Sequence, residues 1–308
     1  MNLFSAQLTN RFISITGPDA VKFLQGQASC DINELSANSF SYSTLNTPKG
    51  RMYCLFKVLK TDDGLLLSMN ESLLDSTLQK LSKYAVFFKC ELKEDCSFEA
   101  YGITSDEAES YDELIKSINL EKETESNCIK HSDAYWLNIS SNNKLCEVWV
   151  NKESTKPSIL NQSEEINTDH WQALETICGI PELYDTSQEE FILQFLNLHH
   201  LGAVSFKKGC YTGQEIIARM KFLGKQKKQP YLLHSDQHCT LAPLESIYDK
   251  EGKKCGTIIR SHWSVKTQSV ALCILPIESA LNISEVFLND ALDLAFSVTE
   301  IDYSQFKK

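Results

Sequence analysis

The chain has 308 residues, of which 42% are hydrophobic and 23% are charged, a composition typical of a globular protein with about two or three domains. Its formal net charge of −11 argues against a dedicated nucleic-acid binder, which normally presents a basic surface. No apolar run approaches the ~18 residues that a membrane span needs, and the first residues carry neither a secretory nor a mitochondrial targeting pattern. We therefore expect a cytoplasmic protein without membrane association.

The first half of the chain predicts strands separated by two helices. Gly17-Pro18-Asp19 starts the first helix, with proline in its permitted first turn, and leucines at helical spacing between 73 and 81 mark the second, which is amphipathic. The segment 104–130 is rich in Glu, Ser and Lys and is expected to hold a loop and one short helix. Alternating apolar runs predict strands at 12–16, 39–45, 51–60, 65–69, 85–92 and 97–103.

The second half predicts a strand pair, a helix and then a region of a different character. The pair covers 134–139 and 145–150, and the helix over 169–178 ends at Gly179. The mixture of antiparallel hairpins and crossing helices favours an α+β fold over a doubly wound sheet. Beyond about residue 228, short apolar runs between turns are typical of a small β-barrel. These runs cover 231–233, 255–260, 269–275, 286–288 and 294–299.

Eleven cysteines are scattered along the chain without any C-x-x-C pair, which argues against a zinc ribbon or a dithiol redox motif. The odd count argues against a disulfide framework. Cysteines inside apolar runs, such as Cys54, Cys146 and Cys273, are expected to be small core residues in a reducing compartment. The pair His199-His200 lacks the spacing that would gather several ligands, so no metal site is predicted.

Residues 208–215 read Lys-Gly-Cys-Tyr-Thr-Gly-Gln-Glu, and they carry the strongest functional signal. Glycine permits positive φ or a close backbone approach, so Cys210 is expected on a tight, exposed loop. Nearby cations favour a thiolate, which predicts that Cys210 is the most reactive of the eleven thiols. A buried cysteine that packs the loop is the alternative interpretation. The supporting positions are Lys208, Gly209, Tyr211, Thr212, Gly213, Gln214 and Glu215.

Two features near this octet have more than one interpretation. Gln214 and Glu215 could support the thiol or could hold the loop backbone by hydrogen bonds. The basic stretch at 219–228 is either a solvated loop or a site for a phosphate or polyglutamate tail, because Lys and Arg neutralise anions.

The octet resembles the signature of the YgfZ proteins, folate-binding relatives of the glycine-cleavage T-protein that support iron–sulfur enzymes. The resemblance covers nearly the whole chain. It implies two ferredoxin-like α+β lobes interleaved within residues 1–228 and a C-terminal β-barrel over 229–308, arranged around a central opening. The further matching segments are 15–19, 23–27, 49–52, 83–87, 179–181, 197–198, 201–203, 205–207 and 218–222.

The resemblance also implies tetrahydrofolate, or another folate, as the cofactor. Trp171 matches a tryptophan that the family uses against the folate ring system, although core packing is the commonest role of a tryptophan. The family's other folate-linked tryptophan falls near Asn10, where this chain has none. Arg219 could pair with a folate carboxylate or form a structural ion pair.

Together these features predict a folate-dependent factor that supports assembly or repair of iron–sulfur proteins and affects tRNA modification indirectly. A tetrahydrofolate-dependent one-carbon transferase, a direct tRNA-modifying enzyme and a purely structural interaction protein are the alternatives. A conventional aminomethyltransferase is not expected, because no motif places a carboxylate beside the reactive nitrogen of the folate. The expected partners are folate and iron–sulfur client or assembly proteins. Any RNA binding should be weak and nonspecific, and the chain is expected to be a monomer.

Overall fold

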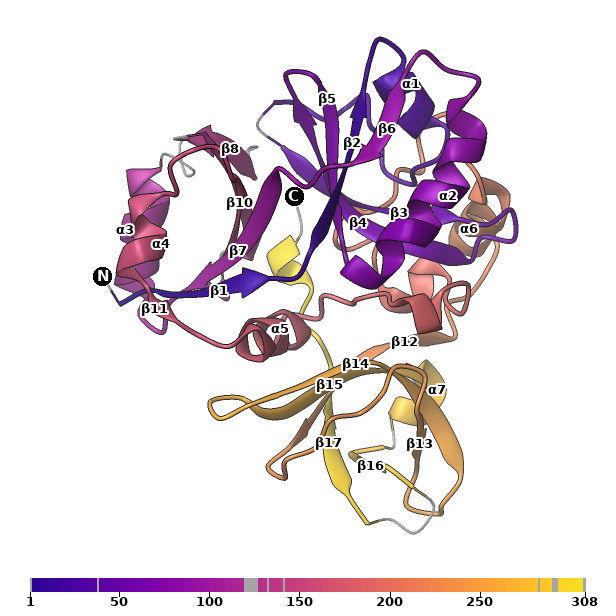
Figure 1. The fold of residues 1–308 in the computed structure, drawn as a ribbon. Coiled ribbons are helices and arrows are strands. Elements are labelled where there is room, and N and C mark those ends of the chain that lie inside the picture. The colour runs from indigo at the N-terminus through magenta and orange to yellow at the C-terminus, as the bar shows by residue number, and fades with distance from the viewer. Residues whose placement is uncertain are drawn as a thin grey trace.

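The computed structural model describes residues 2–37, 39–118, 127–131, 133–140, 142–281, 283–289 and 293–306. Two open β-sheets lie above a closed six-stranded barrel, and helix α5 (Thr168–Ile177) lies between them (Figure 1). The predicted α+β class and the predicted C-terminal barrel are both confirmed.

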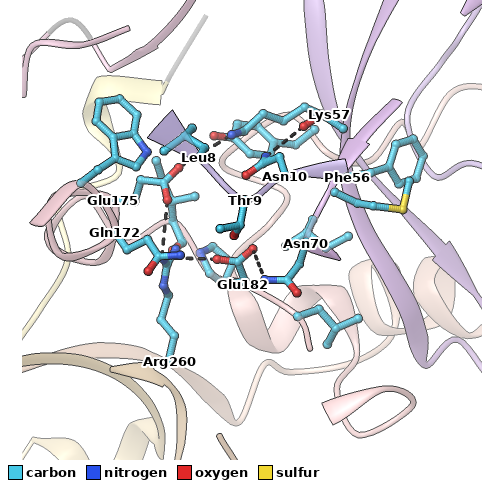
Figure 2. A pocket seen from close by; sticks show the side chains of 18 of the residues that line it. Leu8, Thr9, Asn10, Phe56, Lys57, Asn70, Gln172, Glu175, Glu182 and Arg260 are labelled. Carbon is cyan, nitrogen blue, oxygen red and sulfur yellow. Dashed lines mark hydrogen bonds and ion pairs between the residues drawn. The ribbon is translucent and has the colours of Figure 1, made fainter. Parts of the chain in front are cut away.

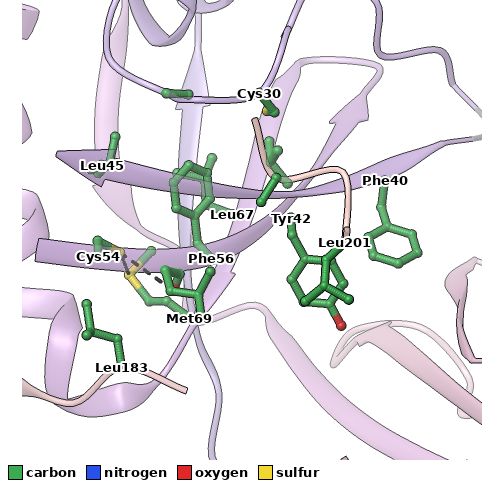
Figure 3. Close-up of a cluster of buried hydrophobic side chains, with 14 of the residues drawn as sticks. Cys30, Phe40, Tyr42, Leu45, Cys54, Phe56, Leu67, Met69, Leu183 and Leu201 are labelled. Carbon is green, nitrogen blue, oxygen red and sulfur yellow. Dashed lines mark hydrogen bonds between the residues drawn. The ribbon is translucent and has the colours of Figure 1, made fainter. Parts of the chain in front are cut away.

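The first sheet has five antiparallel strands in the order β3-β4-β5-β2-β6. Apolar residues fill these strands, and Figure 3 shows Cys54, Phe56 and Met69 inside the cluster that they form. The predicted strands at 12–16, 39–45, 51–60 and 65–69 are confirmed. The elements are β2 (Arg11–Thr16), α1 (Ala20–Gln25), β3 (Phe40–Asn46), β4 (Met52–Thr61), β5 (Gly64–Met69), η1 (Glu71–Leu73), α2 (Leu74–Ala85) and β6 (Glu91–Glu94).

The strand predicted at 85–92 is wrong over most of its length. The helix α2 continues to Ala85, and the strand β6 begins only at Glu91. Val86 and Phe87 between them are 76% and 80% exposed. An apolar run of this length normally indicates a buried strand. The prediction fails here because Val86 and Phe87 are exposed on the surface.

The second sheet has six strands in the order β11-β1-β7-β10-β9-β8. Its β1 was not predicted, and it pairs antiparallel with β7 and parallel with β11. The N-terminus therefore completes a sheet formed mainly by residues about a hundred positions later. The predicted strands at 97–103, 134–139 and 145–150 are confirmed. The elements are β1 (Phe4–Leu8), β7 (Phe98–Thr104), α3 (Ala108–Ser117), β8 (Cys128–His131), β9 (Ala134–Ser140), β10 (Leu145–Asn151), α4 (Ser158–Gln162) and β11 (Glu164–Glu165).

The segment predicted at 104–130 holds the short helix α3 as expected, and it also holds the start of β8, which was not predicted. Residues 119–126 of this segment lie outside the described residues. The two sheets pack on each other through aromatic side chains. The ring of Phe12 on β2 lies 5.2 Å from the ring of Trp149 on β10, edge to face.

The barrel has the strand order β12-β15-β14-β13-β16-β17 and closes because β17 pairs with β12. After β17 the chain returns to α5, where Tyr303 Oη donates a hydrogen bond to the carbonyl of Gly179 at 3.2 Å. Every predicted apolar run falls in a strand, and only β13 was missed. The elements are β12 (Lys228–Ser235), β13 (Ser246–Tyr248), β14 (Lys254–Ser264), β15 (Gln268–Pro276), α7 (Ile277–Ala280), β16 (Glu285–Phe287), β17 (Ala295–Thr299) and η4 (Ser304–Phe306).

Between the second sheet and the barrel, the chain crosses the molecule in helical turns. The helix α5 begins where the side chain of Asn167 accepts a hydrogen bond from the amide of Asp169 at 2.9 Å, a good N-cap. It ends at Gly179, whose φ of 76° lets the chain turn away, as predicted. The remaining elements are η2 (Asp185–Ser187), η3 (Leu193–Leu196) and α6 (Gln214–Phe222), which follows the octet directly.

Candidate functional site

A cavity lies where the two open sheets meet α5 and the barrel strand β14 (Figure 2). Its enclosed space is about 50 Å³, which is smaller than the roughly 300–1,000 Å³ of the usual small-molecule site. Several separate segments of the chain contribute to its wall. Its lining includes Leu8, Thr9, Asn10, Tyr42, Phe56, Lys57, Ser68, Asn70, Thr168, Trp171, Gln172, Glu175, Glu182 and Arg260.

Buried charges form one connected network along this wall. Lys57 Nζ pairs with Glu147 and lies 3.7 Å from Glu175 Oε1. The guanidinium of Arg260 is 1% exposed and lies 3.4 Å from both Glu175 Oε2 and Glu182 Oε2. Figure 2 shows both cations reaching the carboxylates from opposite sides. The network holds three carboxylates and two cations, but Glu147 does not line the cavity, so the charged groups of the lining balance when all are ionised.

The pKa values within this network differ in direction. Burial alone would lower the pKa of Lys57, but the adjacent Glu147 carboxylate raises it above the ordinary value. Burial raises the pKa of Glu182, and the neighbouring Arg260 guanidinium opposes that shift only in part. Lys57 therefore stays a cation at neutral pH, and Glu182 is the carboxyl best suited to hold a proton at the cavity.

Two polar atoms in the cavity wall are buried without a hydrogen-bond partner among the described residues. They are Nε1 of Trp171 and the hydroxyl of Tyr42. A buried, unsatisfied polar group costs about 1–3 kcal/mol. Other polar groups are satisfied, since Asn70 Nδ2 donates to Glu182 Oε1 at 3.1 Å and Asn10 Nδ2 donates to Ser68 Oγ at 2.9 Å. A ligand with suitably placed acceptors would satisfy both unpaired groups.

Trp171 is packed in the core and also forms part of the cavity wall. Its side chain is 1% exposed, and its ring lies so close to β7 that a Cβ on Gly102 would be 2.2 Å from Cδ2 of the indole. The same side chain lines the cavity. Asn10, where the family resemblance placed a second tryptophan, lines the cavity as well.

The octet forms a separate feature on the surface. Cys210 is exposed, as predicted, and Gly213 takes a φ of 85° as the N-cap of α6. A Cβ on Gly213 would lie 2.6 Å from the carbonyl oxygen of Thr47, so the loop requires glycine there for two reasons. A Cβ on Gly209 would meet nothing within 4 Å, and Gly209 has no positive φ. Gly213 therefore has the positive φ and the close backbone approach that were predicted, and Gly209 has neither.

Lys208 is buried and anchors the octet to the turn after α1. Its Nζ donates to the carbonyls of Gln25, Ala28 and Cys30 at 2.7, 2.8 and 2.7 Å. Burial lowers the pKa of Lys208 to about 8. Its three contacts are all with main-chain carbonyls, so its role here is to position the loop.

The other octet residues also have defined places. Tyr211 is buried, burial raises its pKa to about 12, and its ring lies 5.0 Å from Lys208 Nζ. Thr212 Oγ1 lies 3.5 Å from Gln27 Oε1. The side chains of Gln214 and Glu215 make no hydrogen bond to the described part of the loop, so the structure does not support the proposed backbone-holding role.

Among the eleven thiols, Cys210 and Cys96 are the two that are exposed. Burial raises the pKa of most of the others, including Cys255, where it rises to about 11 with Asp249 contributing. Cys54, Cys146 and Cys273 are buried, as predicted.

The octet and the cavity are distinct regions. No octet residue lines the cavity, and neither does Arg219, which is exposed on α6. The structure thus does not bring Arg219 to Trp171. The basic groups in the wall are Lys57 and Arg260, and neither was singled out from the sequence. The available signal was a charged residue inside an otherwise apolar strand, a pattern shared by Lys57, Glu147 and Arg260.

Among the helices of the described residues, none is both long enough and apolar enough to cross a membrane. No group of three or more His, Cys, Asp or Glu side chains in this part of the chain could hold a metal ion.

Two open sheets, a crossing helix and a C-terminal barrel define the fold of the glycine-cleavage T-proteins. The aminomethyltransferase T of the glycine cleavage system from Bartonella henselae matches with a TM-score of 0.70 over 99% of this chain and 87% of that chain. The two sequences are 14% identical, so the match concerns the fold alone.

The chain belongs to the YgfZ family. It is 31% identical over 271 residues to the tRNA-modifying protein YgfZ of Hamiltonella defensa subsp. Acyrthosiphon pisum, a match that covers 85% of this chain and 79% of that protein. It is 29% identical over 275 residues to the tRNA-modifying protein YgfZ of Aliivibrio fischeri strain MJ11, with 86% and 82% covered. No protein-family model matches the chain.

Proposed function

We propose that this protein is a cytoplasmic, tetrahydrofolate-binding factor that supports assembly or repair of iron–sulfur proteins. Its effect on tRNA modification would be indirect, through iron–sulfur enzymes that modify tRNA. The observation that carries the proposal is the cavity at Trp171, with its two unpaired buried donors and the carboxylates of Glu175 and Glu182. The name shared by its relatives, tRNA-modifying protein, supports the connection to tRNA.

The residues of the cavity fit the chemistry of a folate. A pterin is flat, with hydrogen-bond donors along one edge and acceptors along its ring, and it is suited to stack on an indole. Glu175 and Glu182 supply acceptors for the donor edge, and Trp171 Nε1 and Tyr42 Oη supply donors. In this proposal the cavity is part of a central opening between two ferredoxin-like lobes and the barrel. Tetrahydrofolate, when bound, supplies one-carbon carriage or a reducing pteridine.

The exposed thiol of Cys210 belongs to the same proposal but acts at a different surface. Because the octet does not line the cavity and the thiol is exposed, we infer that the thiol meets a protein partner and not the folate. Lys208 and Tyr211 fix the loop from beneath, so that the sulfur stays outside.

One observation favours a second candidate, a tetrahydrofolate-dependent one-carbon transferase. Glu182 is a partly buried carboxyl with a raised pKa in the cavity wall, and such groups serve as general acids or bases. Turnover of a one-carbon donor by the purified protein with tetrahydrofolate, abolished in Glu182→Gln, would establish this candidate in place of the first.

The test of the main proposal uses cells that lack the gene. Wild-type protein should restore the activities of iron–sulfur enzymes and the tRNA modifications that depend on them, whereas Cys210→Ala should not. Cys96→Ala, which removes the other exposed thiol, is the matched control and should restore both fully. Full restoration by Cys210→Ala, or an unchanged iron–sulfur enzyme activity in the deletion strain, would refute the proposal.

A further inference from the structure

The C-terminal end of α6 exposes apolar side chains. Phe222 is 68% exposed and Leu223 is 84% exposed, although they are adjacent in the chain. The ring of Phe222 lies 6.1 Å from the ring of Phe206, edge to face, so Phe206 extends the apolar surface. These three residues form the centre of what we call the α6 patch.

The segment that carries this centre is strongly basic. Residues 205–228 contain seven basic residues and a single acidic one, Glu215, in a chain whose formal net charge is −11. Among the described residues, no carboxylate lies within ion-pair distance of the exposed cations of this segment. These unpaired, exposed cations are Lys207, Arg219, Lys221, Lys225, Lys227 and Lys228.

The α6 patch lies close to the octet along the chain. Lys221 Nζ lies 5.4 Å from the centre of the Phe206 ring, which fixes the end of α6 against the segment that leads into the octet. Cys210 follows Phe206 by four residues, and four residues of fully extended chain span at most about 14 Å. The exposed thiol is therefore close to the apolar centre of the patch.

We propose that the α6 patch is the docking site for an acidic protein. This inference rests on the proposed function and deepens it, because the partner would be the iron–sulfur client or assembly protein that the thiol must reach. The carboxylates of the partner pair with Arg219 and Lys221 at the rim, and its apolar side chains cover Phe222 and Leu223. An apolar centre with a charged rim is the usual anatomy of a protein interface.

The same surface is less suited to RNA. Single-stranded nucleic acid is held by aromatic faces on which bases stack, together with cations that follow the phosphates. Leu223, the most exposed residue of the patch, has no stacking face, and Phe222 already packs edge to face against Phe206. A protein partner accounts for the aliphatic residue as well as for the charge.

A matched control surface lies on the hairpin between β14 and β15. Val265 is 76% exposed there, and the adjacent Lys266 pairs with Asp106 at 2.8 Å. This surface has the same kind of exposed apolar residue, but its cation is already paired. Val265→Ser should therefore leave partner binding unchanged.

The test measures binding of the full-length protein to an iron–sulfur tRNA-modifying enzyme purified from the same cells, by biolayer interferometry at two salt concentrations. Wild-type protein should bind, more weakly at high salt, and Leu223→Ser and Lys221→Glu should each weaken binding at least tenfold. Val265→Ser should bind like the wild type. All three variants should keep the tetrahydrofolate-induced rise in melting temperature, which separates failure of the patch from failure of the folate proposal.

Three results would overturn the inference. They are absence of binding by the wild-type protein, unchanged binding by both patch variants, and tighter binding of purified tRNA than of the enzyme at physiological salt with loss of that tRNA binding in Lys221→Glu. The last result would make the patch an RNA site.

Discussion

The cavity and the octet differ in how the chain forms them and in how exposed their polar groups are. The cavity wall gathers residues from several segments far apart in the chain, and its charged groups are buried and paired with one another. The octet is one continuous segment, its thiol is exposed, and the cations that flank it, apart from the buried Lys208, are exposed and unpaired among the described residues. The proposed function uses this difference, because it assigns a small molecule to the cavity and a larger partner to the octet.

The difference has a consequence for mutations. A substitution in the cavity disturbs packing and buried charge, so stability and ligand binding change together. A substitution at the exposed part of the octet leaves packing intact, so activity can be lost while stability is kept. Four sets of variants test this contrast, beginning with the one that should alter stability most.

Arg260→Met should lower the free energy of unfolding by about 3–5 kcal/mol, because it leaves Glu175 and Glu182 buried with too little positive charge. Chemical denaturation followed by circular dichroism measures the change. Lys250→Met, at an exposed lysine, is the control and should change stability by no more than about 0.5 kcal/mol. A loss no larger than in the control would mean that the network contributes nothing to the fold.

Trp171 should show two different effects in two variants. Trp171→Ala should cost about 3–5 kcal/mol, because it empties a fully buried site against Gly102. Trp171→Phe keeps most of the packing but removes the indole N–H, so it should fold and bind tetrahydrofolate at least tenfold more weakly. Isothermal titration calorimetry measures the affinity, and wild-type affinity in the folded Phe variant would exclude a contact through the indole nitrogen.

The two glycines of the octet offer a matched pair. Gly213→Ala should destabilise the protein by about 1–2 kcal/mol or more, because φ is 85° and the new Cβ would meet the carbonyl of Thr47. Gly209→Ala meets nothing within 4 Å and should be neutral within about 0.5 kcal/mol. Melting temperatures of the two variants provide the comparison, and equal shifts would contradict the described loop geometry.

The weakest of the four effects concerns pH. Burial lowers the pKa of His199 to about 4 from an ordinary value of 6.5, with His200 and Lys221 contributing. The unfolded chain then binds more protons at this position than the folded one, so stability should fall as the pH is lowered from about 6.5 to 4. His199→Gln should have a shallower dependence in this window when melting temperature is measured against pH. Unchanged slopes would show that His199 does not titrate there.

Much of the fold could be predicted from local pattern. The strands of the first sheet and most of the barrel show clear apolar runs between turn residues. β1 lacked a distinct signal because its pairing partners, β7 and β11, lie far along the chain. The run at 85–92 was misassigned because hydrophobicity predicts burial, and Val86 and Phe87 are exposed.

The residues of the candidate site also differ in how far the sequence could predict them. The octet is contiguous, so the sequence located Cys210 and its exposure directly. Glu175, Glu182 and Arg260 meet only after three separate segments have folded together, and no spacing rule connects them. Lys208 was predicted beside the thiol, but its contacts with main-chain carbonyls depend on the turn after α1. Contacts between distant segments are what a local pattern cannot contain.

The proposed function assigns folate to the cavity and gives the thiol a separate role at the surface. The rise in melting temperature that tetrahydrofolate causes in wild-type protein, Glu182→Gln and Cys210→Ala, measured without oxygen, tests this division. A ligand at a hundredfold excess over its Kd stabilises the folded state by about 2.7 kcal/mol. We expect a rise of several degrees in the wild type and in Cys210→Ala, and a clearly smaller rise in Glu182→Gln. Absence of a rise in the wild type, or its loss in Cys210→Ala alone, would contradict this division of roles.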